Sequence, residues 1–233
     1  MTFDVIATGS KGNAVVINGS ILIDIGVPFK ALEPVKKDLK LVLLTHAHGD
    51  HFKPRTVRAL HKERPTLRWG CCEWMVGPLL EAGVDKRVID VYDPDLPAFL
   101  MYGPNLSIRP QRLVHDVPNC GYHIIFTPEH ACRERLFYAT DTATLDGVEA
   151  NGYDLYLIEA NHTREDLETR ARAKMEKGEF AYEVRAAANH LSQEQALDWL
   201  YQQMGPHSQY VFLHAHQDKT QHNPKERSKP NAQ

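Results

Sequence analysis

The stretch LVLLTHAHGDH at residues 41–51 places four apolar residues directly before a dense group of histidines and an aspartate. A continuous apolar run of this length is typical of a strand that is buried on both faces. The residues after it have the pattern H-x-H-x-D-H, from His46 to His51. Three imidazoles and a carboxylate at such density favour metal ligation over an ordinary solvated loop.

The spacing of the motif indicates how it would divide between metal ions. His46 and His48 lie two residues apart, so in an extended segment their side chains point to the same side and can bind one ion. Asp50 and His51 follow the bend and can face a second ion. Nitrogen and oxygen ligands without thiolate suit Zn²⁺, with Mn²⁺ and Fe²⁺ as alternatives.

One motif cannot complete two metal sites, so further ligands are expected from later in the chain. His115, Asp141 and His214 each follow an apolar run that is predicted to be a strand. A residue just beyond the end of a strand can reach a shared edge of the sheet. His216 competes with His214 for the last position, because the two lie on the same side of an extended segment. Asp141 is a carboxylate that can bridge two ions.

The rest of the chain predicts strands with interspersed helices, which favours an α/β or α+β class with the strands inside. Asn18-Gly19 between two apolar runs predicts a hairpin. Residues 219–233 are polar and lack apolar periodicity, so we expect a flexible tail there. Helix 192–204 is expected to bury Ala196, Leu197 and Leu200. Other helices are expected over residues 54–63, 71–83 and 163–176.

Composition narrows the class of protein further. The 233 residues include 13 histidines, close to the 14 glycines, and the formal net charge is −3. The histidine excess agrees with metal ligation, and the charge gives no global basic field to attract nucleic acid. No run approaches the roughly 20 apolar residues that span a bilayer, and we see no signal peptide. We therefore expect a cytoplasmic protein without a membrane partner, with its four cysteines as free thiols.

The motif and its surroundings resemble the metallo-β-lactamase superfamily. H-x-H-x-D-H after a strand is the most specific signature of that superfamily, and LIDIG at residues 22–26 is similar to its usual N-terminal run. The resemblance implies one domain over residues 1–218, an αββα four-layer sandwich of two mixed β-sheets flanked by helices. It implies two divalent metal ions at one edge, and homodimers are common among its members. It implies these roles: His46, His48 and His115 on the first ion; Asp50, His51 and His214 on the second; Asp141 bridging both; and Asp24 orienting the motif.

Other residues resemble the phosphodiesterase branches of the superfamily. Asp141 stands where true β-lactamases commonly have cysteine. His190 begins HLSQEQA, which is similar to a stretch in RNase Z, phosphonate-pathway phosphodiesterases and small bacterial exonucleases; there the histidine contacts the substrate phosphate or the leaving group. GSKGN at residues 9–13 and the segment from Glu159 to His162 also resemble the small exonucleases, and this would bring His162 near the site. Alternatively, His190 flanks a helix and GSKGN is a tight turn.

The resemblance therefore implies a hydrolase that uses two metal ions to cleave phosphodiester bonds, above all in nucleic acid, as an exonuclease or RNase Z-like enzyme. Asp50 and His190 would be catalytic, His190 by donating a hydrogen bond or proton to the leaving oxygen. A phosphodiesterase acting on cyclic or other small nucleotides is the alternative. A thioesterase or lactonase of the glyoxalase II kind is a weaker one. Despite the negative net charge, lysines and arginines between residues 30 and 58 could form a local basic surface.

Overall fold

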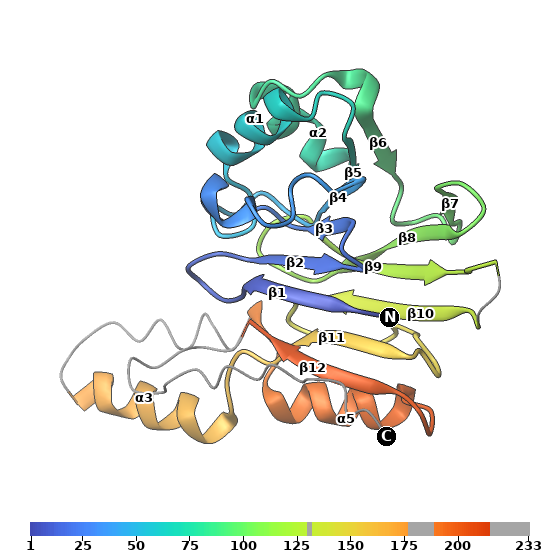
Figure 1. The fold of residues 1–233 in the computed structure, drawn as a ribbon. Helices are drawn as coiled ribbons and strands as arrows, with labels where there is room; N and C mark the ends of the chain where they lie inside the picture. The colour runs from blue at the N-terminus through green and yellow to red at the C-terminus, as the bar shows by residue number, and fades with distance from the viewer. Residues whose placement is uncertain (130–131, 177–188, 215–233) are drawn as a thin grey trace.

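Two six-stranded β-sheets face each other in the computed structural model, which describes residues 1–129, 132–176 and 189–214 (Figure 1). Strands β1–β3 and β7–β10 pair antiparallel, whereas β3–β6 and β10–β12 pair in parallel, so both sheets are mixed. The first sheet has the order β1 (Phe3–Ala7), β2 (Ala14–Ile17), β3 (Ile21–Ile23), β4 (Leu41–Leu44), β5 (Arg68–Cys72) and β6 (Ile89–Tyr92). The second has the order β12 (Gln209–Leu213), β11 (Leu155–Glu159), β10 (Glu134–Ala139), β9 (Asn119–Phe126), β8 (Leu106–Leu113) and β7 (Leu100–Met101).

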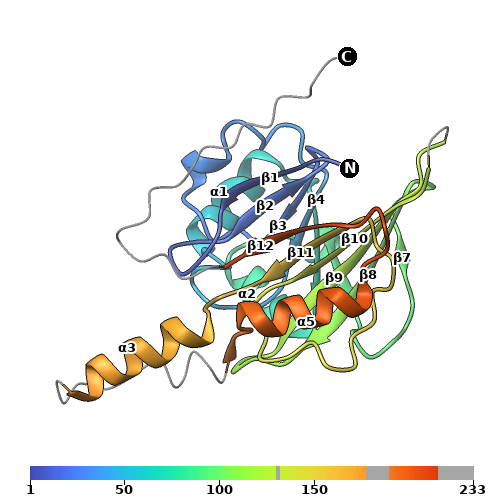
Figure 2. The ribbon, with the colours of Figure 1, turned by 90° about the horizontal axis from the view of Figure 1, so that it is seen from below.

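Helices cover the outer faces of the two sheets, which gives four layers (Figure 1). Helices α1 (Pro54–Glu63) and α2 (Val76–Glu81) pack on the first sheet, and α5 (Gln193–Gln203) packs on the second. Helix α3 (Arg164–Glu176) extends away from the sandwich (Figure 2). This arrangement confirms the predicted αββα class. Three short 3₁₀ turns complete the described elements: η1 (Phe29–Leu32), η2 (Glu73–Met75) and η3 (Lys86–Val88).

Strand β4 shows how the sandwich is held together. Its side chains alternate between two hydrophobic clusters: Val42 and Leu44 pack under α1 and α2, whereas Leu41 and Leu43 pack against the second sheet. All four are buried, as the sequence predicts for a strand covered on both faces. Each such side chain contributes about 1.5–3 kcal/mol through its burial. The histidine motif therefore begins at the end of a firmly anchored strand.

Local predictions are confirmed where short-range signals are strong. Asn18 and Gly19 have φ of 46° and 65°, as a hairpin turn between β2 and β3 requires. Helix α1 has the predicted bounds. Helix α5 begins with a complete capping box, in which the Ser192 hydroxyl accepts from Gln195 N and the Gln195 side chain accepts from Ser192 N.

Two local predictions are wrong. The expected helix over residues 71–83 begins only at Val76, because Cys71 and Cys72 are the buried end of β5 and pair with β6. In α5 the buried stripe is Ala196, Trp199 and Leu200, whereas Leu197 is 39% exposed. The three buried residues follow the i, i+3, i+4 spacing of one helix face, which leaves Leu197 to the side.

Some predictions fall outside what the structure describes. The expected tail at residues 219–233 and the rival ligand His216 lie outside the described residues. The domain boundary at residue 218 stays a prediction. None of the described helices is long and apolar enough to cross a membrane.

Candidate metal centre

The predicted ligands gather at one edge of the sandwich, because each lies just beyond the end of a strand. Asp24 follows β3 and the histidine motif follows β4, while His115, Asp141 and His214 follow β8, β10 and β12. Within the described residues, their nitrogen and oxygen atoms form four groups whose members lie within 4.8 Å of one another. The groups are His46 with His48 and His115; Asp50 with His51 and His214; His46 with His51 and Asp141; and Asp141 with Glu159, His190 and His214.

The first group is a triangle of imidazole nitrogens with the dimensions of a metal site. His48 Nδ1 lies 3.2 Å from His46 Nε2 and 3.4 Å from His115 Nε2. A tetrahedral Zn²⁺ at about 2.0–2.1 Å from each nitrogen would hold its ligand atoms about 3.3–3.4 Å apart. The two distances from His48 are close to this separation, and all three nitrogens lie within 4.8 Å of one another, so the group fits one cation.

The other ring nitrogen of each histidine in this triangle is close to a polar group. His46 Nδ1 is 2.9 Å from the Thr45 hydroxyl, and His115 Nδ1 is 3.2 Å from the Asn189 carbonyl oxygen. His48 Nε2 lies 3.4 Å from the Asp116 carboxylate. For His46 and His48, such contacts favour the tautomer that leaves the facing nitrogen unprotonated. Burial and the neighbouring His51 also lower the pKa of His46 to about 2, so this imidazole is neutral, as a ligand must be.

The second group lies deeper. His51 is fully buried, with Nδ1 2.6 Å from the Asp24 carboxylate and Nε2 3.8 Å from Asp50. His214 Nε2 lies 3.6 Å from Asp50 and 3.5 Å from Asp141; it is buried and makes no hydrogen bond to the described residues. A buried nitrogen that faces two carboxylates beyond hydrogen-bond range is the arrangement expected around a cation. This donor set of nitrogen and oxygen atoms fits the divalent metal that the fold implies.

Carboxylates dominate the electrostatics of this second group. Burial opposes a charge on His51, but Asp24 and Asp141 outweigh it and raise the pKa of His51 to about 10. The pKa of His214 is also well above its usual range, because Asp50 and Glu159 outweigh the effect of burial. His51 and His214 must therefore each give up a proton to act as ligands.

Asp141 lies between the two groups. Its Oδ2 is 2.6 Å from His51 Nε2 and 4.0 Å from His46 Nε2, and its Oδ1 is 3.5 Å from His214 Nε2. The contact with His51 has the length of an ion pair, although Oδ2 makes no hydrogen bond to the described residues. Burial would raise the pKa of Asp141, but His51 holds it well below its usual range. A carboxylate in this position can contact cations on both sides.

His190 and Glu159 form a pair beside Asp141. His190 Nδ1 lies 2.5 Å from Glu159 Oε1 and 3.3 Å from Asp141 Oδ1. Glu159 is fully buried and also accepts from the backbone N–H of Thr142. Burial lowers the pKa of His190, but Glu159 outweighs it, so the net shift is upward. His190 is therefore a candidate proton donor that is held in place through Nδ1.

The N-terminal loop supports the motif from the other side. Asn13 is buried, accepts from Gly9 N at 2.8 Å, and places its Nδ2 2.8 Å from His51 Nε2. Asn13 N donates to the Asp50 carbonyl at 2.6 Å. A side chain at Gly26 would collide with that same carbonyl, so the close approach requires glycine there. The GSKGN turn thus orients the second group.

The structure places the predicted site residues Asp24, His115, Asp141, His190 and His214 close to the histidine motif. Glu159, Thr45 and Asn13 also belong to the centre, and we did not assign roles to them from the sequence. Glu159 ends a strand, the same signal that pointed to the other ligands.

His162 pairs with Ser192 in an isolated bridge and is in none of the four groups. In the basic stretch, Lys36 is bound by Glu33 and Glu63, and Lys53 donates to the Gly26 carbonyl.

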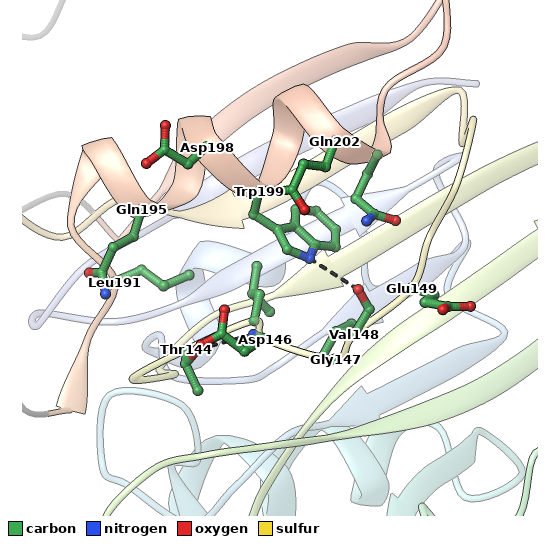
Figure 3. A pocket seen from close by; sticks show the side chains of 12 residues that line it. Thr144, Asp146, Gly147, Val148, Glu149, Leu191, Gln195, Asp198, Trp199 and Gln202 are labelled. Atoms are coloured by element: carbon green, nitrogen blue, oxygen red, sulfur yellow. Dashed lines mark hydrogen bonds between the residues drawn. The ribbon is translucent and has the colours of Figure 1, made fainter.

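A cavity of about 400 Å³ lies between α5 and the loop after Asp141 (Figure 3). The Trp199 indole donates to the Val148 carbonyl at 3.0 Å within it. Among the described residues, the cavity is lined by three carboxylates, Asp146, Glu149 and Asp198, and by no lysine or arginine. The described lining residues do not include any member of the four metal-binding groups. Its charge makes it a poor site for a phosphate.

Together, the sandwich and the histidine–aspartate groups at its edge define a metallo-β-lactamase-fold protein. The sequence profile of the beta-lactamase superfamily domain matches residues 19–215, so the chain belongs to this superfamily. This confirms the resemblance on which the fold prediction rested.

Individual relatives narrow the comparison. The chain is 26% identical over 183 residues to the exodeoxyribonuclease YycJ of Bacillus anthracis, a match covering 71% of this chain and 64% of that protein. The chain thus spans less than two thirds of the length of this relative. The structure of human tRNase Z, short form (ELAC1), is similar with a TM-score of 0.66 at 16% identity over 93% of both chains. The metallo-beta-lactamase fold protein YhfI from Bacillus subtilis has a TM-score of 0.65 at 16% identity, over 91% of this chain and 85% of that one. At these identities the two structures bear on the fold alone.

Proposed function

We propose that the protein is a metal-dependent phosphodiesterase that cleaves nucleic acid and uses two divalent cations, with Zn²⁺ as the preferred ion. The observation that carries the proposal is the position of Asp141 between two groups of ligand atoms, with the His190–Glu159 pair beside it. In this proposal His46, His48 and His115 would hold one cation, Asp50, His51 and His214 would hold the other, and Asp141 would contribute its carboxylate to both sites. Cations there supply an acidified water and positive charge for the phosphoryl oxygens.

Asp50 and His190 would carry out the two proton transfers of the reaction. Asp50, whose pKa is lowered by His214 against the effect of burial, is an ionised carboxylate that can accept a proton from the attacking water. His190 is 19% exposed at its side chain, so it can meet the substrate while Glu159 holds Nδ1. The upward pKa shift keeps a proton available on its ring, which suits donation to the leaving oxygen.

The comparisons support nucleic acid as the substrate class. A protein named as an exodeoxyribonuclease is a sequence relative of this chain. The bridging position is an aspartate, and the sequence from His190 resembles phosphodiesterase branches. These points favour phosphodiester cleavage over the glyoxalase II type of activity.

Metal analysis and a substrate panel test the proposal. We expect two divalent ions per chain, and faster hydrolysis of single-stranded DNA or RNA than of a cyclic nucleotide or a thioester. Activity on a polynucleotide should fall steeply with salt, because counterions are released on binding, whereas activity on a small nucleotide should change far less. Faster hydrolysis of the thioester would refute the proposal, and salt-independent activity confined to cyclic nucleotides would move the substrate to the small-molecule class.

A further inference from the structure

A second cavity, of about 470 Å³, is lined by residues at and just beyond the carboxyl ends of β5 and β6, by Arg112 in β8 and by Pro118 in the loop that follows β8. Strands β4, β5 and β6 are parallel, so their carboxyl ends meet at the same edge. Trp74 follows β5 and Asp93 follows β6, and both line the cavity. The ends of β5 and β6 lie one and two strands from the end of β4, where the histidine motif begins. At the usual spacing between strands, the cavity is therefore roughly 5–10 Å from that end.

Two contacts tie this cavity to the metal ligands. The Trp74 indole N–H donates to the Thr45 carbonyl at 3.0 Å, directly before His46. Pro118, which lines the cavity from the second sheet, belongs to the same loop as Asp116, whose carboxylate lies 3.2 Å from His115 Nε2. The walls of the cavity thus adjoin residues beside His46 and His115, which brings a group next to the metal centre within reach of the cavity.

The chemistry of the lining suits a flat, uncharged ring. Arg112 places its guanidinium carbon 5.7 Å from the centre of the Trp74 ring, so the guanidinium already lies over the indole. Aromatic and guanidinium planes are the surfaces on which nucleobases stack, so a base can stack against this Trp74–Arg112 pair. Glu73 and Asp93 are exposed carboxylates in the lining, and they can accept hydrogen bonds from base N–H groups.

The same charges disfavour a phosphate in the cavity. Arg112 is already paired with Asp95, through nitrogen–oxygen distances of 2.8 and 2.6 Å. The remaining charged groups of the lining, Glu73 and Asp93, are negative. Like charges that are brought together at a binding surface are repulsive. The base of a nucleotide fits here, whereas its phosphate does not.

We propose that this cavity binds the base of the nucleotide adjoining the scissile phosphodiester, stacked against the Trp74–Arg112 pair. The inference rests on the proposed phosphodiesterase function and adds a subsite to it. The subsite would make hydrolysis favour esters that carry a nucleoside over esters with the same leaving group and no base.

Matched esters test this preference. The substrates are the 5′ and 3′ p-nitrophenyl phosphate esters of thymidine and methyl p-nitrophenyl phosphate, which share a leaving group. We expect the wild type to prefer at least one thymidine ester. Trp74→Ala should lower the ratio of kcat/KM for that ester to kcat/KM for the methyl ester by about 5- to 150-fold, the value of one stacked base, because the lost Thr45 contact affects both esters alike. Trp74→Phe should keep most of the preference, and Tyr201→Ala, at a site that is 91% exposed on α5, should keep all of it.

A binding measurement on the same variants does not depend on turnover. Trp69 is fully buried and Trp199 is 8% exposed, so Trp74 is the tryptophan best placed to report a ligand by fluorescence. Thymidine monophosphate should quench the wild type and Tyr201→Ala but not Trp74→Phe, and methyl phosphate should quench none of them. If the esters are hydrolysed without a thymidine preference, or Trp74→Ala slows both classes equally, the subsite is wrong and the phosphodiesterase function stands. If no ester is hydrolysed, the proposed function fails, and quenching alone decides whether a base binds at Trp74.

Discussion

Replacing Asp24 with asparagine should change how many protons leave when metal binds. Asp24 is fully buried and accepts hydrogen bonds from Thr45 N at 2.9 Å and from the Thr45 hydroxyl, and its Oδ2 lies 2.6 Å from His51 Nδ1. Its charge is the largest influence that raises the pKa of His51 to about 10. A shift from 6.5 to 10 corresponds to about 5 kcal/mol in favour of the charged imidazole.

The number of protons released on metal binding depends on the charge of the ligand histidines before the metal binds. In the wild type His51 and His214 both carry an extra proton at pH 7.5, whereas the pKa values of His46 and His115 are lowered mainly by burial. Because ligand imidazoles are neutral, filling both sites should release about two protons, one each from His51 and His214. In Asp24→Asn the largest charge that opposes burial is gone, so the pKa of His51 should fall and the release should decrease, by up to one proton.

Calorimetric titration of the metal-free protein with Zn²⁺, in buffers of different ionisation enthalpy at pH 7.5, counts these protons. Asp4→Asn, an exposed carboxylate on β1, is the matched control and should behave as the wild type. Asp24→Asn should also bind metal about 10- to 100-fold more weakly, because the amide no longer selects the His51 tautomer that frees Nε2. Equal proton release from the wild type and Asp24→Asn would refute the assignment of His51 as a charged group held by Asp24.

Three further outcomes are expected. His190→Ala should lower kcat by about 10²- to 10⁴-fold with two metal ions retained, as measured by turnover and metal analysis; loss of metal would make His190 a ligand instead. Asp50→Ala should lose one ion and the activity together, and full activity with a single ion would contradict the two-metal proposal. The third outcome concerns His123, whose pKa is lowered to about 3, mainly by burial and then by the charge of Arg109. As the pH falls, His123 takes up a proton in the unfolded chain before it does so in the folded protein. The free energy of unfolding therefore decreases as the pH falls from 6.5 towards 3. Urea unfolding should therefore show that the wild type loses about 1 kcal/mol more than His123→Phe between pH 7 and 5.5, and parallel losses would contradict the low pKa.

The first ligand group could be predicted because most of its geometry is local. His46 and His48 follow a strand whose four apolar residues are unmistakable, and their spacing alone directs them to one side. His115 required only the further assumption that a polar residue beyond a strand end reaches the sheet edge. That assumption also anticipated the position of Asp141 and His214.

Glu159 shows where such reasoning stops. It ends β11, which lies between β10 and β12 in the sheet, and this order places it beside both Asp141 and His214. The sequence does not reveal strand order, so the resemblance of the segment from Glu159 to His162 to the small exonucleases gave no role for Glu159 itself. The two local errors have a similar origin. The apolar residues at 71–83 allow a strand or a helix, and only pairing with β6 decides for Cys71 and Cys72.

Backbone conformation separates the residues of the centre from ordinary turn residues. Among the described residues, four other than glycine have positive φ: Asn18, Asp24, Asp141 and His214. Asn18 is accounted for by its hairpin turn. Each of the other three lies just beyond a strand and in the centre, and such a conformation costs about 1–3 kcal/mol. Asp24 N still donates to β4, through Leu43 O, and His214 N donates to the Thr8 hydroxyl, so the surrounding contacts hold these residues in place. Since no tight turn explains these three conformations, we infer that they are retained because they direct carboxylate and imidazole groups across the sheet edge towards one another.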